Sequence, residues 1–90
     1  FTPGGFNLDQ NFPNPFNPAT TIRFTVNEPG FVSLKVYDVL GREVADLVQN
    51  YLQPGIHQAP FSGANLASGI YYYRLTLNGN AAVKQMLLLK

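Results

Sequence analysis

The chain has 90 residues, enough for one domain with a single modest hydrophobic core. Apolar residues make up 46% and charged residues 12%, a balance that excludes a highly charged disordered segment. The net charge of +1 comes from scattered single charges, and no basic patch is present to bind nucleic acid or anionic lipid. There is no cysteine for a disulfide or a thiolate metal site. The longest apolar run, residues 86–89, is too short for a transmembrane segment.

The N-terminal part is rich in proline, which disfavours a helix there. We predict that residues 1–10 are a linker from a preceding domain and that residues 11–90 form one domain. Because the chain starts at Phe1 with no leader peptide, we expect it to be a piece of a longer protein. Within residues 11–18 (NFPNPFNP), Phe12 and Phe16 stand among turn formers. We expect both rings to be buried and to hold this irregular segment on a sheet.

Apolar and polar residues alternate over residues 20–26 and 32–36, which predicts two strands. Their core-facing side chains are Ile22, Phe24, Val26, Val32, Leu34 and Val36. Turn-forming residues at 29–30, 38–41 and 54–55 separate the extended runs. The spacing of Val44, Leu47 and Val48 fits a helical turn, whereas Val44, Asp46 and Val48 fit a strand. The position of residues 43–50 between two turns favours the strand.

The second half of the chain continues in the same way. A short extended piece at residues 56–61 precedes a small, polar loop at residues 62–69. Residues 70–77 (IYYYRLTL) carry the strongest strand signal, and Asn78-Gly79 predicts a tight hairpin that leads into a return strand at residues 82–90. Six to seven short strands separated by regular turn signals predict an all-β antiparallel sandwich.

The sequence lacks a convergent set of catalytic groups. The single histidine, His57, is predicted to face solvent, and no serine stands in a nucleophile-elbow pattern. The five carboxylates lack the spacing of a zinc or calcium site, and Asp38 is explained by capping its turn. We therefore predict no enzymatic activity, no metal and no cofactor.

Two apolar features could serve either packing or binding. Tyr72, between two neighbouring tyrosines, could stack on a sugar ring, but period two explains all three positions by placing Tyr71 and Tyr73 in the core. The last strand is apolar on both faces. It is either a central strand buried on both sides or an exposed edge to which another chain can add.

Five stretches of the chain then match, in order, a known family pattern. They are NFPNPFNP with Thr20-Thr21-Ile22, residues 32–44 (VSLKVYDVLGREV), Pro54-Gly55-Ile56-His57, residues 66–75 (LASGIYYYRL), and residues 84–90 (KQMLLLK). Together they resemble the type A C-terminal sorting domains of the type IX secretion system. Many members of that family carry a tryptophan where this chain has Phe61 before Ser62-Gly63.

The resemblance implies an immunoglobulin-like sandwich, related to that of flagellar hook-capping proteins, at the end of an exported multidomain protein. It implies passage through the periplasm of a Gram-negative bacterium to the cell surface or medium. The implied partners are the upstream cargo domain, an outer-membrane translocon and a sortase-like protease that cuts the domain off, with residues 1–10 as the expected region of cleavage. The matching recognition residues are Gly69, Tyr71, Lys84, Met86, Leu87, Leu88, Leu89 and Lys90.

Two other functions stay open at this point. The domain could be a carbohydrate-binding or cell-attachment module of a secreted hydrolase, with Tyr72 as the stacking residue. It could also be an immunoglobulin-like structural spacer.

Overall fold

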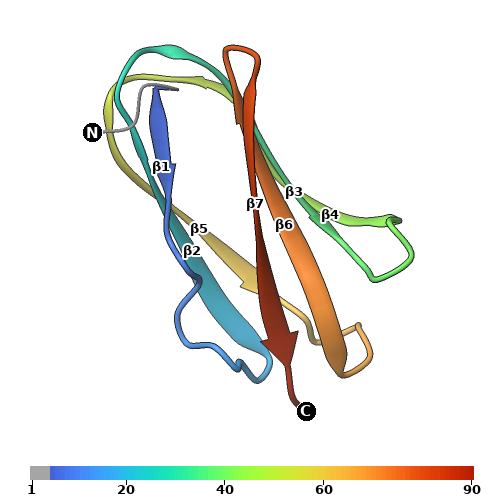
Figure 1. Ribbon diagram of the computed structural model, residues 1–90. Helices are drawn as coiled ribbons and strands as arrows, with labels where there is room; N and C mark the ends of the chain where they lie inside the picture. The colour runs from blue at the N-terminus through green and yellow to red at the C-terminus, as the bar shows by residue number, and fades with distance from the viewer. Residues whose placement is uncertain (1–4) are drawn as a thin grey trace.

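The computed structural model describes residues 5–90, which form seven antiparallel strands in two facing sheets (Figure 1). The order β1-β2-β5 makes one sheet and the order β4-β3-β6-β7 makes the other. The strands are β1 (Phe6–Leu8), β2 (Ala19–Val26), β3 (Gly30–Tyr37), β4 (Glu43–Leu52), β5 (Gly55–Ser62), β6 (Gly69–Leu77) and β7 (Asn80–Leu88). This arrangement confirms the predicted all-β sandwich. No helix within residues 5–90 is long and apolar enough to cross a membrane.

The core lies between the sheets and is built by the period-two alternation of their strands. The inward side chains predicted for β2 and β3 are all buried, as are Tyr71 and Tyr73 of β6, whereas Tyr72 points to the outer face. Each large apolar side chain buried in this way contributes about 1.5–3 kcal/mol to folding. The packing prediction for the three tyrosines is therefore confirmed.

The ambiguous segment at residues 43–50 is a strand, as its position between turns predicted. The register between β3 and β4 shifts between Leu34 and Lys35 and again between Val36 and Tyr37. At each shift β4 carries one extra residue, Leu47 in the first and Val44 in the second, as in a β-bulge. The extra residues break the two-residue period, and this explains the helix-like spacing of the apolar residues.

The hairpin between β6 and β7 has the predicted two-residue turn. Asn78 and Gly79 have φ angles of 49° and 82°, both in the left-handed region that a type I′ turn requires. The turn fixes a register in which Leu77 pairs with Asn80 and Gly69 pairs with Leu88. The last strand is thus an edge strand of the larger sheet, not a central one.

The linker prediction for residues 1–10 is wrong where the structure describes that segment. Residues 6–8 pair with β2, and the side chains of Phe6 and Leu8 are buried in the core. Only three residues long, β1 is too short to show a period in the sequence. Residues 1–4 of the predicted linker lie outside the described residues. Its other residues, Gly5, Asp9 and Gln10, stand on either side of β1 in the chain.

The two phenylalanines of the proline-rich segment, which we define as residues 10–18, behave differently. Phe16 is buried and packs edge-on against Phe61, with 6.0 Å between the ring centroids. Phe12 is 81% exposed, so the prediction that both rings are buried holds for Phe16 alone. Phe12 instead pairs through its backbone with Thr21 of β2, which leaves its side chain on the outside.

A buried polar cluster fixes the start of the proline-rich segment. The Tyr73 hydroxyl donates a hydrogen bond to the Asp9 carbonyl oxygen (2.7 Å) and accepts one from the Asn11 backbone N–H (2.8 Å). The Asn11 side chain donates to the Thr20 hydroxyl oxygen (3.1 Å), and that hydroxyl donates to the Pro13 carbonyl oxygen (2.8 Å). Burial raises the pKa of Tyr73 to about 12.

Replacing Tyr73 with Phe should lower the free energy of unfolding by about 1–3 kcal/mol, because the buried Asn11 N–H loses its acceptor. The matched control is Tyr72→Phe on the outer face, which should leave the free energy within about 0.5 kcal/mol of the parent chain. Urea unfolding followed by circular dichroism measures both variants. Equal stability of the two variants would contradict the stabilising role of the hydrogen bond between Asn11 and the Tyr73 hydroxyl.

The raised pKa of Tyr73 also predicts a dependence on alkaline pH. Between pH 10.0, the ordinary value, and about 12 the folded chain keeps a proton on Tyr73 that the unfolded chain has lost. The stabilisation is therefore complete below pH 10.0 and decreases as the pH rises toward about 12. The difference in unfolding free energy between the parent chain and Tyr73→Phe should shrink over this interval. A constant difference across it would argue against a protonated, buried hydroxyl.

Candidate functional site

The predicted recognition residues lie where β6 begins and β7 ends, but only some of them reach the surface. Met86 and Leu88 are buried in the core, on the same face of the sheet as Tyr71 and Tyr73. A partner cannot contact these two side chains while the domain is folded. Their place in the terminal motif is explained by packing.

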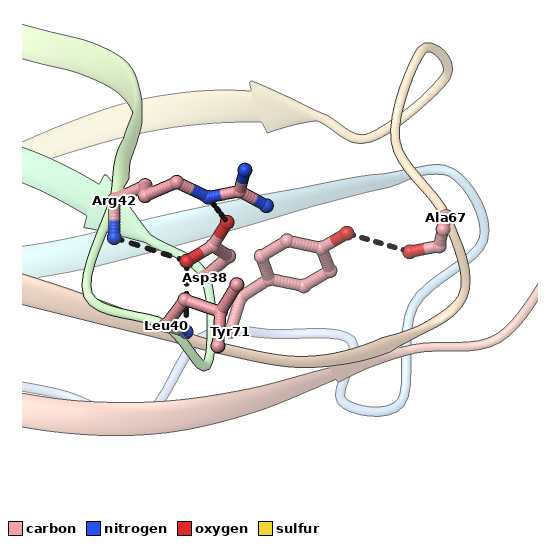
Figure 2. A network of polar contacts seen from close by, with 5 residues as sticks. All are labelled: Asp38, Leu40, Arg42, Ala67 and Tyr71. Carbon is pink, nitrogen blue, oxygen red and sulfur yellow. Dashed lines mark hydrogen bonds and ion pairs between the residues drawn. The ribbon is translucent and has the colours of Figure 1, made fainter.

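Gly69 and Tyr71 also have structural roles at the entrance to β6. Gly69 has a φ of 149°, a conformation that favours glycine, although a side chain there would meet no atoms. The hydroxyl of the buried Tyr71 donates a hydrogen bond to the Ala67 carbonyl oxygen at 2.6 Å (Figure 2). Together these residues set the path of the loop that leads into β6.

The accessible part of the motif consists of Lys84, Leu87, Leu89 and Lys90. Lys84 and Leu87 are half-buried, and Leu89 is 50% exposed. Lys90 bonds to the β5–β6 loop: its backbone N–H donates to the Ser68 hydroxyl oxygen (2.9 Å) and its Nζ to the Ala64 carbonyl oxygen (2.6 Å). The end of the chain is therefore held against this loop.

On its other side the end of β7 is covered by the proline-rich segment. The Phe16 N–H donates to the Leu87 carbonyl oxygen, and the Leu89 N–H donates to the Phe16 carbonyl oxygen, both at 3.0 Å. Figure 1 shows this segment, between β1 and β2, at the same end of the sandwich as the C-terminus. Phe16 thus acts as a one-residue parallel strand beside Leu88.

Side-chain amides extend this closure along the edge. The Leu87 N–H donates to Asn14 Oδ1 at 3.0 Å, and Gln10 Nε2 donates to the Gln85 carbonyl oxygen at 2.7 Å. Proline lacks an N–H, so side-chain amides replace backbone groups in this proline-rich stretch. Neither Asn14 nor Gln10 is among the predicted site residues, because only the phenylalanines of this segment carried that prediction. The asparagines interleaved with the prolines were the available signal.

The turn between β3 and β4 is the second polar network drawn in Figure 2. Asp38 Oδ1 accepts hydrogen bonds from the backbone N–H groups of Leu40 (2.9 Å) and Arg42 (3.0 Å), and Arg42 Nε donates to Asp38 Oδ2 (2.8 Å). The backbone hydrogen bond from Arg42 is the main reason that the pKa of Asp38 is lowered. The capping role predicted for Asp38 accounts for this carboxylate without a ligand.

Tyr72 lies on the outer face of the larger sheet, opposite Tyr37. With Arg74, Val39 and Val83 it lines a shallow hollow of about 320 Å³. The role of Tyr72 in stacking on a sugar stays a prediction.

His57 is half-buried on the inner side of β5, not on the face that points to solvent as expected. Its ring stacks on Phe24 with 5.6 Å between centroids, and its Nε2 lies 2.8 Å from the Gln53 carbonyl oxygen. Phe24 is the cross-strand partner of His57, so the period-two register of β5 turns the imidazole inward. Within residues 5–90 no group of three or more His, Asp or Glu side chains could hold a metal ion.

Comparisons with known proteins agree with this architecture. Residues 10–89 match the family model described as a secretion system C-terminal sorting domain. The fold resembles part of dimeric latent PorU from Porphyromonas gingivalis (TM-score 0.74, 22% identity), covering 93% of this chain and 9% of that one. It also resembles part of PorZ, a surface component of the type IX secretion system of the same organism (TM-score 0.65, 17% identity, 93% and 12% covered). No curated protein matches the chain.

Replacing Asn14 with Ala should speed hydrogen exchange of the Leu87 amide about fivefold, because one hydrogen bond contributes roughly 1 kcal/mol. The matched control is Asn17→Ala, since the exposed Asn17 makes no side-chain hydrogen bond within residues 5–90. Amide exchange followed by NMR measures both. Unchanged exchange at Leu87 in Asn14→Ala would show that this side chain does not close the edge.

Proposed function

The chain belongs to the family of secretion system C-terminal sorting domains, and from that premise we propose that it carries a larger protein through the type IX secretion system and attaches it to the cell surface. The proposed route passes through the periplasm of a Gram-negative bacterium. The domain acts there as a non-catalytic tag for an upstream cargo domain. Its proposed partners are the outer-membrane translocon and a sortase-like protease.

The observation that supports this proposal most directly is the way the terminal motif is held. The end of β7 is bonded to the proline-rich segment on one side and to the β5–β6 loop on the other. Residues 84–90 are therefore presented as a folded surface, on which Gln85, Leu89 and Lys90 are exposed. The opening and closing motifs of the family resemblance meet at this surface.

We place the cleavage of the domain on the N-terminal side of β1. Proteases need an extended segment free of backbone pairing, and residues 6–8 are paired with β2. Cleavage within β1 would first require its removal from the sheet.

The recognition proposal is tested with this chain fused behind an exported fluorescent reporter in a host with a type IX system. Deleting residues 84–90 would also remove buried Met86 and Leu88, so exposed substitutions are the better probe. The double variant Leu89→Asp, Lys90→Glu should reduce surface delivery roughly tenfold, the loss expected from about 1.4 kcal/mol of recognition energy. The reporter should accumulate in the periplasm.

The matched control for this experiment is Ile56→Asp, an exposed apolar-to-acid change on the other sheet. It should leave delivery at the parent level. Thermal melting of the purified variants checks that all of them are folded. Delivery of the double variant at the parent level, with the fold intact, would refute the proposed recognition surface.

A further inference from the structure

A groove of about 370 Å³ is lined by residues of β1 and β7. Each of these strands, drawn in Figure 1, is an edge strand of its own sheet. Residues 6–8 line one side and residues 80–84 line the other. Edge strands present free backbone donors and acceptors, which natural proteins usually cover. Two of the four sheet edges, those of β1 and β7, line this groove, and β4 and β5 form the other two.

The register of the β6–β7 hairpin shows which backbone groups of β7 face outward. The two-residue turn makes Leu77 and Asn80 a hydrogen-bonded pair, so alternate residues from Ala81 onward point their N–H and C=O groups away from β6. At Leu87 and Leu89 these outward groups bond to the proline-rich segment. At Ala81 and Val83 they have no partner within residues 5–90.

The facing edge of β1 is open in the same way. The Asp9 N–H bonds to Arg23 and the Gly5 carbonyl oxygen to Asn27, so the odd-numbered residues face β2. The backbone groups of Phe6 and Leu8 therefore point away from β2 and have no hydrogen-bond partner within residues 5–90. The groove thus has open backbone groups along both walls.

Lys84 adds a charge to this groove. Its register opposite Tyr73 places it on the inner face of β7, where it is half-buried. No carboxylate lies within 4.0 Å of its Nζ in residues 5–90, whereas Lys35, Arg23 and Arg42 each have an acidic partner. Because Lys84 lines the groove and has no acidic partner in residues 5–90, a ligand that brings a carboxylate would form an ion pair there.

We propose that this groove accepts an extended acidic segment of the export machinery, which pairs with the backbone of Ala81 and Val83 and places a carboxylate on Lys84. The open stretch at residues 81–83 is about 10 Å long, room for three or four residues of an added strand. The inference rests on the proposed function and specifies how the domain binds the export machinery. It adds a second contact to the surface formed by Leu89 and Lys90.

The test uses the same reporter fusion with Val83→Pro and, separately, Lys84→Glu. Proline at position 83 removes an outward N–H and spares the β6–β7 ladder, so the melting temperature should stay within about 4 °C of the parent value. Each variant should lower surface delivery at least about tenfold. Ala81→Pro is the second backbone variant, in case proline at position 83 unfolds the domain.

Two controls accompany these variants. Arg74→Glu makes the same charge change as Lys84→Glu on the outer face of β6 and should be delivered normally. Ala82→Pro removes an N–H that faces Leu75 within the sheet and should lower the melting temperature by well over about 4 °C.

Two results together would overturn the groove proposal. A folded proline variant, either Val83→Pro or Ala81→Pro, is delivered at the parent level, and so is the separate variant Lys84→Glu. If Leu89→Asp, Lys90→Glu blocks delivery in the same experiment, the proposed function survives that failure. If that double variant is also delivered normally, both proposed contact surfaces fail while the export function stands. The proposed function itself fails if the parent fusion stays in the periplasm. Sedimentation of the parent chain should show a monomer. A dimer that Val83→Pro dissociates would assign the groove to a second copy and refute the proposal.

Discussion

The backbone hydrogen bonds between Phe16 and the end of β7 join two parts of the chain that lie more than 70 positions apart. They complete the otherwise open edge of the larger sheet over Gln85–Leu89, and Asn14 and Gln10 extend them with side-chain amides. Each such bond contributes only about 1 kcal/mol net, but unpaired backbone groups would leave this edge free to pair with other chains. The buried cluster around Tyr73 and Asn11 holds the segment in register with this edge. The accessible surface of the terminal motif depends on both contacts.

The closure divides β7 into two halves with different properties. Residues 85–88 are paired on both sides and supply the core residues Met86 and Leu88. Residues 81–84 are paired only with β6 and border the groove beside β1. A motif that looks uniform in the sequence therefore combines packing, edge protection and accessible groups. Mutations in it have to be assigned to these roles one residue at a time, because removal of the whole motif also removes the buried side chains of Met86 and Leu88.

Strands in which apolar and polar residues alternate regularly can be predicted from the sequence. Period two predicts the inward faces of β2, β3 and β6, and Asn78-Gly79 predicts the hairpin turn. The bulges at Val44 and Leu47 disturb that period in β4. Burial of Phe6 and Leu8 depends on pairing with β2 and has no local signature. Likewise, the site could be predicted only in part. The asparagines between the prolines indicate that side-chain amides form hydrogen bonds there, but the partners of Asn14 and Gln10 on β7 depend on the tertiary fold.

The long sequence separation of the Phe16 and Gln10 contacts has a consequence for synthesis. The proline-rich segment pairs with the end of β7, so the sandwich cannot finish folding until the ribosome has synthesised β7. A translation product that stops before residue 86 lacks Met86, Leu88 and the strand edge that Phe16 needs. The folded domain therefore forms only in chains whose synthesis has passed through β7.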